Sequence, residues 1–168
     1  MNGAQVRQVA RVVVIDPEDR VLLFDTRLAY TRVWMAPGGA VEQGETYEEA
    51  AARELWEEAG IRADSLSPCL WTLGFVFEKE GRVYDQRERY FAAHATTSDV
   101  HAGNREASER SQILEHRWWT LAEILGSSAD FRPRNLAALL HAVLAGAHAD
   151  HPLEALVERS ARLIEPRA

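Results

Sequence analysis

The sequence predicts an α/β (α+β) protein, an α/β/α sandwich in which helices cover both faces of a mixed β-sheet and further helices follow at the C-terminus. Short β-branched segments and helical segments follow one another in mixed order, which is the pattern of a sheet packed between helices. The 168 residues contain no repeat and no linker, so a single domain over residues 1–168 is expected. Its core should span about residues 5–130, with a helical extension over about residues 131–168.

The N-terminal part predicts a hairpin, a short strand and a turn. Val6–Ile15 is rich in β-branched residues and ends at the turn-forming run 16–19. Arg20–Arg27 resumes the apolar pattern, so the two segments should pair as a hairpin. Trp34–Ala36 is a short strand that enters the turn at Pro37-Gly38-Gly39.

The segment after this turn predicts the central helix. Thr46 can accept from a free amide at the helix start, and Glu49 can reach back to the amide of Thr46, so the two form a capping box. Gly60 is the expected left-handed terminator. The helix should therefore run from about Tyr47 to Ala59.

The second half of the chain predicts strands and helices separated by a polar loop. The expected strands are Cys69–Phe77, Arg82–Ala95 and His116–Thr120. The expected helices are Leu121–Leu125, Asn135–Ala145 and Leu153–Ile164, with Gly146 and Pro152 as boundaries. Residues 96–111 are small, polar and charged, so they should form a surface loop.

Composition and charge restrict the class of protein. The hydrophobic fraction of 46% and charged fraction of 27% are those of a soluble protein, and no apolar run approaches the ~20 residues that span a bilayer. Residues 1–8 contain no signal-peptide core and Cys69 has no disulfide partner, so a cytoplasmic protein is expected. The net charge of -7 argues against binding nucleic acid by charge neutralisation. A phosphate substrate would therefore need local cationic groups or bound metal.

Glu54, Glu57 and Glu58 lie on one arc of the central helix, at spacings of three and four residues. Like charges at these spacings destabilise a helix, and the ordinary interpretation of such a cluster is a solvated acidic face. Two features favour a site instead. The Pro-Gly-Gly turn lets backbone approach a ligand closely, and carboxylate and carbonyl oxygens are the ligands that Mg²⁺ and Mn²⁺ prefer.

The same segment resembles the box of the Nudix hydrolase family. The defined positions are Gly39, five residues, Glu45, seven residues, Arg53-Glu54-Leu55, one residue, Glu57-Glu58, one residue and Gly60-Ile61. The resemblance implies a Nudix-type fold and a divalent ion, Mg²⁺ or Mn²⁺, held by Glu54, Glu57, Glu58 and the carbonyl of Gly38. It also implies that Arg53 orients the glutamates and that Glu45 supports the loop and helix.

Many members of the family add a carboxylate from a later loop, as a further metal ligand or a general base. Glu106, Glu109 and Glu115 are the candidates here, and we favour Glu109 because it closely precedes the His116–Thr120 strand. The implied reaction is attack of a metal-activated water on a phosphorus of a diphosphate, in a nucleoside diphosphate linked to a group X. Which glutamate accepts the proton stays open.

The substrate is the least specified part of the prediction. Arg27 at the end of the second strand is placed to contact a phosphate, Trp34 to stack on a base, and the backbone at Gly39 to approach the ligand. Arg7 and Arg11 on the first strand are further phosphate candidates. The expected partner is a small nucleotide or other diphosphate, bound by a monomer or a homodimer, with no nucleic acid and no membrane.

Two other functions share this fold. A non-catalytic Nudix-like module would bind or sense a nucleotide, but such modules usually lose box glutamates and this chain keeps them. An isoprenoid-diphosphate isomerase would need a cysteine before the box, whereas Cys69 follows it. A metal-dependent pyrophosphohydrolase is therefore the favoured function.

Overall fold

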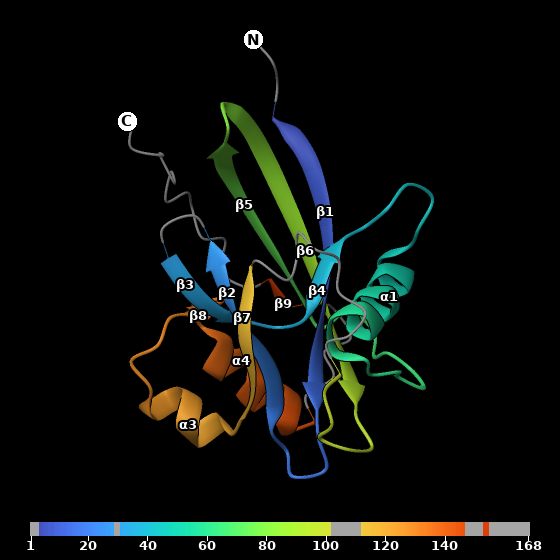
Figure 1. The fold of residues 1–168 in the computed structure, drawn as a ribbon, viewed down its shortest axis with the longest axis vertical. Helices are drawn as coiled ribbons and strands as arrows, with labels where there is room; N and C mark the ends of the chain where they lie inside the picture. The colour runs from blue at the N-terminus through green and yellow to red at the C-terminus, as the bar shows by residue number, and fades with distance from the viewer. Residues whose placement is uncertain (1–3, 29–30, 102–111, 147–152, 155–168) are drawn as a thin grey trace.

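The computed structural model describes residues 4–28, 31–101, 112–146 and 153–154 (Figure 1). Its helices are α1 (Tyr47–Ala59), α3 (Leu121–Gly126) and α4 (Leu136–Leu144). Its strands are β1 (Gln5–Ile15), β2 (Val21–Leu28), β3 (Thr31–Met35), β4 (Gly38–Ala40), β5 (Trp71–Lys79), β6 (Arg82–His94), β7 (Ile113–Trp119), β8 (Phe131–Arg132) and β9 (Leu153–Glu154).

All the described strands belong to one mixed sheet, as predicted. Their order is β8-β3-β2-β1-β6-β5-β9, while β4 pairs with β1 and β7 pairs with β2. The long pair at the centre is parallel, with β1 beside β6 from Gln5↔Tyr84 to Ile15↔His94. Most other pairs, including β5 with β6, are antiparallel. The expected strands over Cys69–Phe77 and Arg82–Ala95 are thus confirmed as neighbours.

The predicted β1–β2 hairpin is confirmed at its turn, but the two strands then separate. They pair at Ile15↔Val21 only, after which β2 pairs with β3. The chain crosses from the edge of β2 to the edge of β1 between Met35 and Gly38, where the Val12 amide donates to the carbonyl of Pro37 at 2.9 Å. This crossing delivers the glycine pair onto β1 beside α1.

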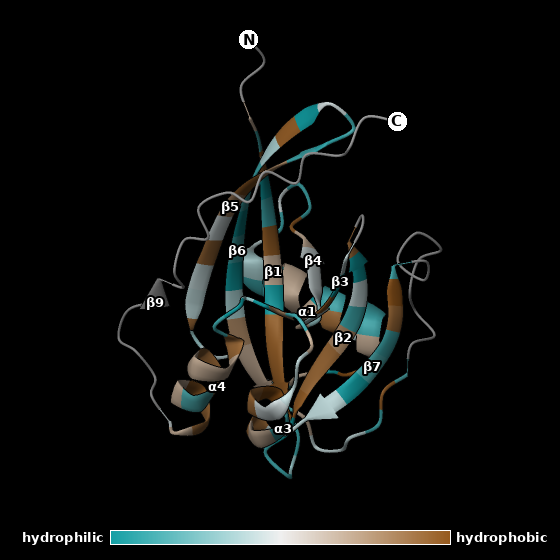
Figure 2. Ribbon diagram, turned by 90° about the vertical axis from the view of Figure 1, so that its left-hand side faces the viewer, coloured by the Kyte–Doolittle hydropathy of each residue, from teal (hydrophilic) through white to brown (hydrophobic). Residues whose placement is uncertain are grey.

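Helices lie on both faces of the sheet, α1 on one side and α3 with α4 on the other (Figures 1 and 2). Alternation along β1 explains the two layers, because successive side chains point to opposite faces. Ala10, Val12 and Val14 pack in the cluster that contains α1 residues. Val13 and Ile15 pack in the cluster that contains α3 and α4 residues. The predicted sandwich is therefore confirmed.

Three local predictions need correction. Gly38 and Gly39 were expected in a turn, yet Gly38–Ala40 pairs with β1 as a short strand, because the separation of β1 from β2 leaves that edge of β1 open. Phe131–Arg132 adds an unexpected strand beside β3. Leu153–Glu154, expected to start a helix, pairs with β5 in parallel, since the edge of β5 offers backbone partners.

The remainder of the expected C-terminal helix, residues 155–164, lies outside the described part of the chain. The helices α3 and α4 agree with prediction to within a residue at each end. Within the described residues, no helix has the length and apolar character needed to cross a membrane.

Candidate functional site

The helix α1 is capped at both ends as predicted, and this fixes where its glutamates lie. Thr46 Oγ1 accepts from the Glu49 amide at 3.1 Å, and Glu49 Oε2 accepts from the Thr46 amide at 2.8 Å. Gly60 ends the helix in the left-handed region at φ 66°. Leu55 is fully buried against the sheet, so Glu54 on the adjacent position is turned toward β4. The two caps therefore fix where α1 begins and ends, and the burial of Leu55 determines which side of the helix faces the sheet.

Glu54 and Glu58 are buried against the glycine pair of β4. The amide of Gly38 donates to Glu58 Oε2 at 2.7 Å. A Cβ atom on Gly39 would lie 2.3 Å from Glu54 Oε1, a distance that real Cβ atoms do not reach. A Cβ atom on Gly38 would lie 2.1 Å from the carbonyl oxygen of Ala10, and its φ of +144° also disfavours a side chain. Glycine at position 39 therefore allows the Glu54 carboxylate to approach the backbone, and glycine at position 38 allows β4 to pack closely against β1.

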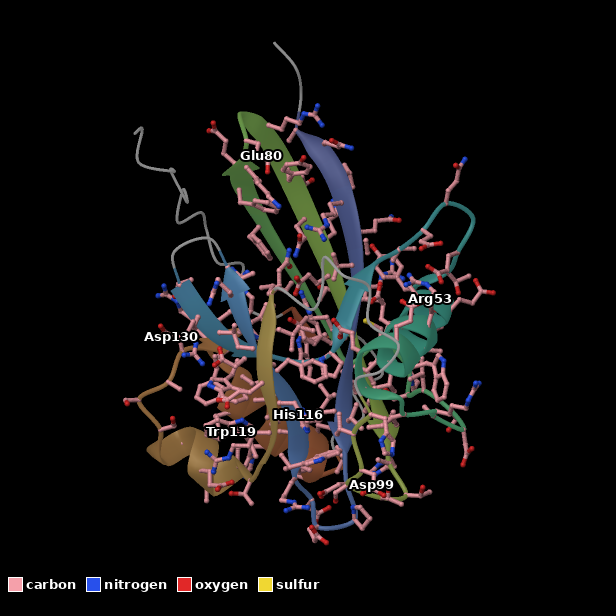
Figure 3. The ribbon with its side chains drawn as sticks, in the orientation of Figure 1. Arg53, Glu80, Asp99, His116, Trp119 and Asp130 are labelled. Carbon is pink, nitrogen blue, oxygen red and sulfur yellow. The ribbon has the colours of Figure 1, made fainter. Side chains whose placement is uncertain are left out.

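Arg53, on α1 (Figure 3), forms hydrogen bonds with three carboxylates of the box. Its guanidinium donates to Glu45 at 2.9 and 3.0 Å, to Glu54 Oε1 at 2.8 Å and to Glu57 Oε2 at 3.1 Å. It also donates to the carbonyl of Ala40 at 2.9 Å. The predicted box residues are therefore brought together, with the arginine at their centre.

Charge at this cluster is strongly negative. One arginine faces the four carboxylates of Glu45, Glu54, Glu57 and Glu58, so these five side chains keep a formal excess of three negative charges. The hydrogen bonds from Arg53 lower the pKa of Glu45 below its ordinary value against the opposing effect of burial. Those same hydrogen bonds raise the pKa of Arg53. Glu45, whose pKa is lowered, therefore stays ionised at neutral pH.

In the described part of the chain, no three His, Cys, Asp or Glu side chains converge closely enough to form a ready-made metal site. The box carboxylates instead point to Arg53 and to the Gly38 amide. Their chemistry still fits a hard divalent cation, because they are carboxylate oxygens in negative excess beside the partly accessible backbone of the glycine pair. The close approach of Glu54 to Gly39 adds a cradle that any side chain at position 39 would fill.

The predicted substrate residues lie on three strands, Arg27 on β2, Trp34 on β3 and Gly39 on β4. Arg27 is exposed opposite Arg32, and in the described residues no carboxylate lies within ion-pair distance of Arg27. Arg32 forms an ion pair with the buried Asp25. Trp34 is half-buried and packs edge-on against Trp119, with ring centroids 5.0 Å apart. The structure thus leaves Arg27 available for an anion, and places Trp34 partly in the core.

Of the three candidates for an additional carboxylate, only Glu115 lies within the described residues. Glu109, the favoured one, and Glu106 lie outside the described residues. Glu115 is exposed on β7, in register with Asp25 of β2. The role expected for Glu109 therefore stays a prediction.

Arg11 and Glu88 form a buried ion pair that the sequence pattern did not identify. Arg11 was expected as a phosphate contact, but it is only 8% exposed and binds the 1% exposed Glu88. Along β6, Glu88 and Tyr90 face the core, while Arg87 and Arg89 are exposed. The available signal was an arginine inside the apolar run of β1, since a buried charge requires a partner.

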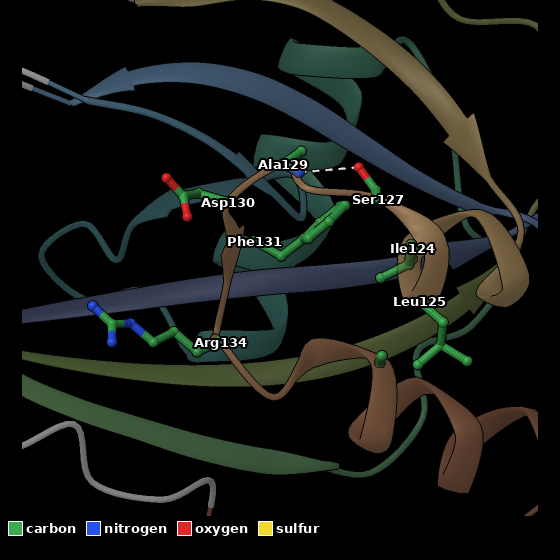
Figure 4. A pocket seen from close by; sticks show the side chains of 8 residues that line it. Ile124, Leu125, Ser127, Ala129, Asp130, Phe131 and Arg134 are labelled. Atoms are coloured by element: carbon green, nitrogen blue, oxygen red, sulfur yellow. Dashed lines mark hydrogen bonds between the residues drawn. The ribbon is translucent and has the colours of Figure 1, made fainter.

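A shallow cavity of about 490 Å³ lies between α3, β8 and α4, away from the box (Figure 4). Its lining includes Ile124, Leu125, Phe131 and Arg134. No box residue contributes to it, so it has no part in the cluster around Arg53.

The sequence matches a family model and several curated proteins. The NUDIX domain model matches residues 6–140. The RNA pyrophosphohydrolase of Roseobacter denitrificans is 26% identical over 156 residues, which cover 81% of this chain and 90% of that protein. Phosphatase NudJ of Escherichia coli is 44% identical over 50 residues, 30% of this chain and 33% of that protein.

Solved structures share the fold. The MutT protein from Methanosarcina mazei matches 89% of this chain and 100% of its own, with a TM-score of 0.65 and 18% identity. The NUDIX domain of Shewanella oneidensis NrtR, solved with ADP ribose, matches 86% of this chain and 90% of its own, with a TM-score of 0.63 and 17% identity. At these identities the likeness shows the architecture alone.

Proposed function

The chain belongs to the Nudix hydrolase family, and from this we propose that it hydrolyses the diphosphate linkage of a nucleoside diphosphate joined to a group X, with Mg²⁺ or Mn²⁺ as cofactor. One observation carries the proposal. The capped helix α1 buries the carboxylates of Glu54 and Glu58 against the backbone of the glycine pair, beside a cluster with excess negative charge. Such a set of hard oxygen atoms suits divalent cations.

Glu54, Glu57, Glu58 and the carbonyl of Gly38 would hold the ion. When bound, it would lower the pKa of an attacking water and stabilise the negative charge that develops on the phosphate oxygens. It would also offset the net charge of -7, which otherwise repels an anionic substrate. A cation bound by these carboxylates would therefore reduce the electrostatic repulsion between the acidic protein and a phosphate substrate.

The chain's own side chains set the geometry of this site. Arg53 holds Glu54, Glu57 and Glu45 at hydrogen-bond distance and limits the motion of their carboxylates. Among the three expected metal ligands Glu54, Glu57 and Glu58, Glu57 is the most exposed, with 32% of its side chain accessible. A box glutamate or Glu109 would accept the proton of the attacking water.

Substrate recognition would involve β2 and β3, the strands that precede the glycine pair in the chain. Arg27 offers an exposed guanidinium, and three residues separate Trp34 from the start of β4. The relative named RNA pyrophosphohydrolase adds RNA with a 5′ phosphoanhydride to the candidate substrates. The acidic charge of the chain favours a small nucleotide over a long polyanion.

A substrate panel tests the proposal. The purified chain is incubated with ADP-ribose, a dinucleoside polyphosphate, nucleoside triphosphates and a short 5′-triphosphorylated RNA, with Mg²⁺ or Mn²⁺ and with EDTA as the metal-free arm. Products are separated by anion exchange, which also identifies the phosphorus that is attacked. We expect turnover of at least one substrate, lost on chelation.

Two glutamate-to-glutamine variants, one at an expected metal ligand and one away from the metal ligands, complete the test. Glu58→Gln should lower turnover by about a hundredfold or more, since a bound metal contributes several kcal/mol to transition-state stabilisation. Glu48→Gln, on an exposed position of the first turn of α1, should leave turnover unchanged. Full activity of Glu58→Gln would refute the metal assignment. Tight nucleotide binding without turnover would support the non-catalytic module instead.

A further inference from the structure

The guanidinium of Arg11 reaches from β1 to the chain crossing that precedes the box. Its Nη1 donates to the carbonyl of Ala36 at 3.1 Å and to the carbonyl of Gly38 at 3.4 Å. Its Nε and Nη2 donate to the two carboxylate oxygens of Glu88 at 3.2 and 3.3 Å. One buried arginine therefore joins β1, β6 and the segment that carries the glycine pair.

Glu88 is itself fully engaged, which fixes the position of Arg11. Tyr90 donates its hydroxyl to Glu88 Oε2 at 2.7 Å, and Gln86 donates its amide to Oε1. Burial alone would raise the pKa of Glu88, but the charge of Arg11 and these hydrogen bonds lower it below its ordinary value. The carboxylate is therefore ionised and its acceptor capacity is used.

The Gly38 residue is held from two directions. Its amide donates to Glu58 Oε2 at 2.7 Å, and its carbonyl oxygen accepts from Arg11 Nη1. The peptide group before Gly38 is also held by the Val12 amide, which donates to the Pro37 carbonyl at 2.9 Å. The hydrogen bond from Arg11 is the side-chain contact that bears directly on the carbonyl of Gly38, which has a φ of +144°.

A buried ion pair contributes little net stability, because desolvation offsets the attraction of the charges. Net stability therefore does not explain why Arg11 and Glu88 are buried together. The electrostatics beside the Gly38 carbonyl offer an explanation. An unpaired arginine beside the carbonyl of Gly38 would repel a cation there, whereas the negative charge of Glu88 offsets it.

We propose that the Arg11–Glu88 pair is a positioning unit that orients the Gly38 carbonyl for divalent metal, with Glu88 offsetting the positive charge of Arg11 beside that carbonyl. The inference rests on the proposed function, since Gly38 is a metal ligand only there. Arg11 and Glu88 are both buried, so they would act through the backbone of Gly38. Their removal should weaken metal binding and turnover together, while binding of the nucleotide changes little.

The test uses the full chain and direct binding of Mn²⁺, measured by electron paramagnetic resonance without substrate. The double variant Arg11→Met/Glu88→Gln removes both charges and keeps an acceptor for Tyr90 and Gln86. We expect its Mn²⁺ dissociation constant to rise about 10- to 100-fold, as for other groups that orient metal ligands. Its kcat should fall in proportion, with KM within about threefold of wild type.

Two further variants keep the test decisive. Arg20→Met removes an arginine bound to the buried Asp16 at the far end of β1, and it should leave Mn²⁺ affinity unchanged. Arg11→Lys keeps the charge but loses the fork that reaches two carbonyls and a carboxylate, so an intermediate loss is expected. If the double variant does not fold, as judged by circular dichroism, Arg11→Lys decides the outcome.

The results separate this inference from the proposed function. Wild-type Mn²⁺ affinity in Arg11→Lys and in the folded double variant would overturn the positioning role while leaving the hydrolase activity intact. Absence of both Mn²⁺ binding and turnover in the wild-type chain would overturn the proposed function and the inference with it. Weakened binding in the control Arg20→Met to the same extent would show a general loss of rigidity, and would also overturn the inference.

Discussion

The carboxylate of Glu54 occupies the space where a side chain of residue 39 would begin. A Cβ atom built on Gly39 would lie 2.3 to 2.6 Å from the carboxyl carbon and oxygens of Glu54. The first residue of the box and a glutamate in the middle of α1 are thus packed directly against each other. The glycine at position 39 of the box is therefore required by the packing of Glu54 against it.

Replacing Gly39 by alanine should displace Glu54. The added methyl cannot be accommodated without moving either the carboxylate or β4, so we expect Mn²⁺ affinity and turnover to fall at least about tenfold. Overpacking of this kind should also lower the free energy of unfolding by about 1–3 kcal/mol. Gly126→Ala is the matched control, because nothing lies within 4 Å of its added methyl. Unchanged Mn²⁺ affinity in Gly39→Ala would refute the cradle.

Replacing Arg53 by lysine should impair turnover even though the positive charge is kept. A lysine at this position cannot bind Glu45, Glu54 and Glu57 at once, because it has one ammonium group in place of a planar fork. We expect Arg53→Lys to lower kcat about 10- to 100-fold. The exposed Arg117→Lys, which loses an ion pair with Glu123 away from the box, serves as control and should keep wild-type kcat. Equal rates for both variants would show that Arg53 does not orient the glutamates.

The capping box of α1 should contribute to stability. Thr46→Ala removes the acceptor for the Glu49 amide and should lower the free energy of unfolding by about 1 kcal/mol. For a chain of this length that corresponds to a fall in Tm of about 2–4 °C. A double-mutant cycle with Glu49→Ala measures the coupling of the two contacts, since both form the same cap. Strict additivity would contradict the reciprocal cap seen in the structure.

Local signals were sufficient to predict α1 and its cluster. The helix start, its left-handed end at Gly60 and the common arc of Glu54 and Glu58 all depend on residues within one short segment. The ion pair of Arg53 with Glu57, four residues further along α1, also follows from helix geometry. The site residues that lie inside the box could therefore be placed from the sequence.

Contacts between distant strands could not be predicted in this way. Arg11 and Glu88 are 77 residues apart, and their pairing depends on β1 lying parallel to β6 in a specific register. The separation of β1 from β2, which opens an edge for β4, is likewise a property of the whole sheet. The start of the expected last helix is wrong at Leu153 because an edge strand competes with local helical preference.

Asp16 at the β1–β2 turn should give the protein a recognisable loss of stability in acid. Its buried carboxylate accepts hydrogen bonds from the amides of Glu18 and Arg20, from the Arg20 guanidinium and from the Ser98 hydroxyl. Burial acts to raise the pKa of Asp16, but the hydrogen bonds, chiefly from Arg20, lower it below 3.8. The unfolded chain therefore takes up this proton at a higher pH than the folded chain does.

It follows that the contribution of Asp16 is fully present above its unfolded pKa of about 3.9, and is lost as the pH falls through the lower pKa of the folded state. Asp16→Asn should lower the free energy of unfolding at pH 7 by about 1–3 kcal/mol, the range for hydrogen bonds to a charged group. The difference between wild type and variant should shrink steadily below about pH 4. Urea unfolding at pH 7, 5, 4 and 3 measures it. A difference that stays constant over this range would mean that the Asp16 charge contributes nothing, and that only the shape of the turn matters.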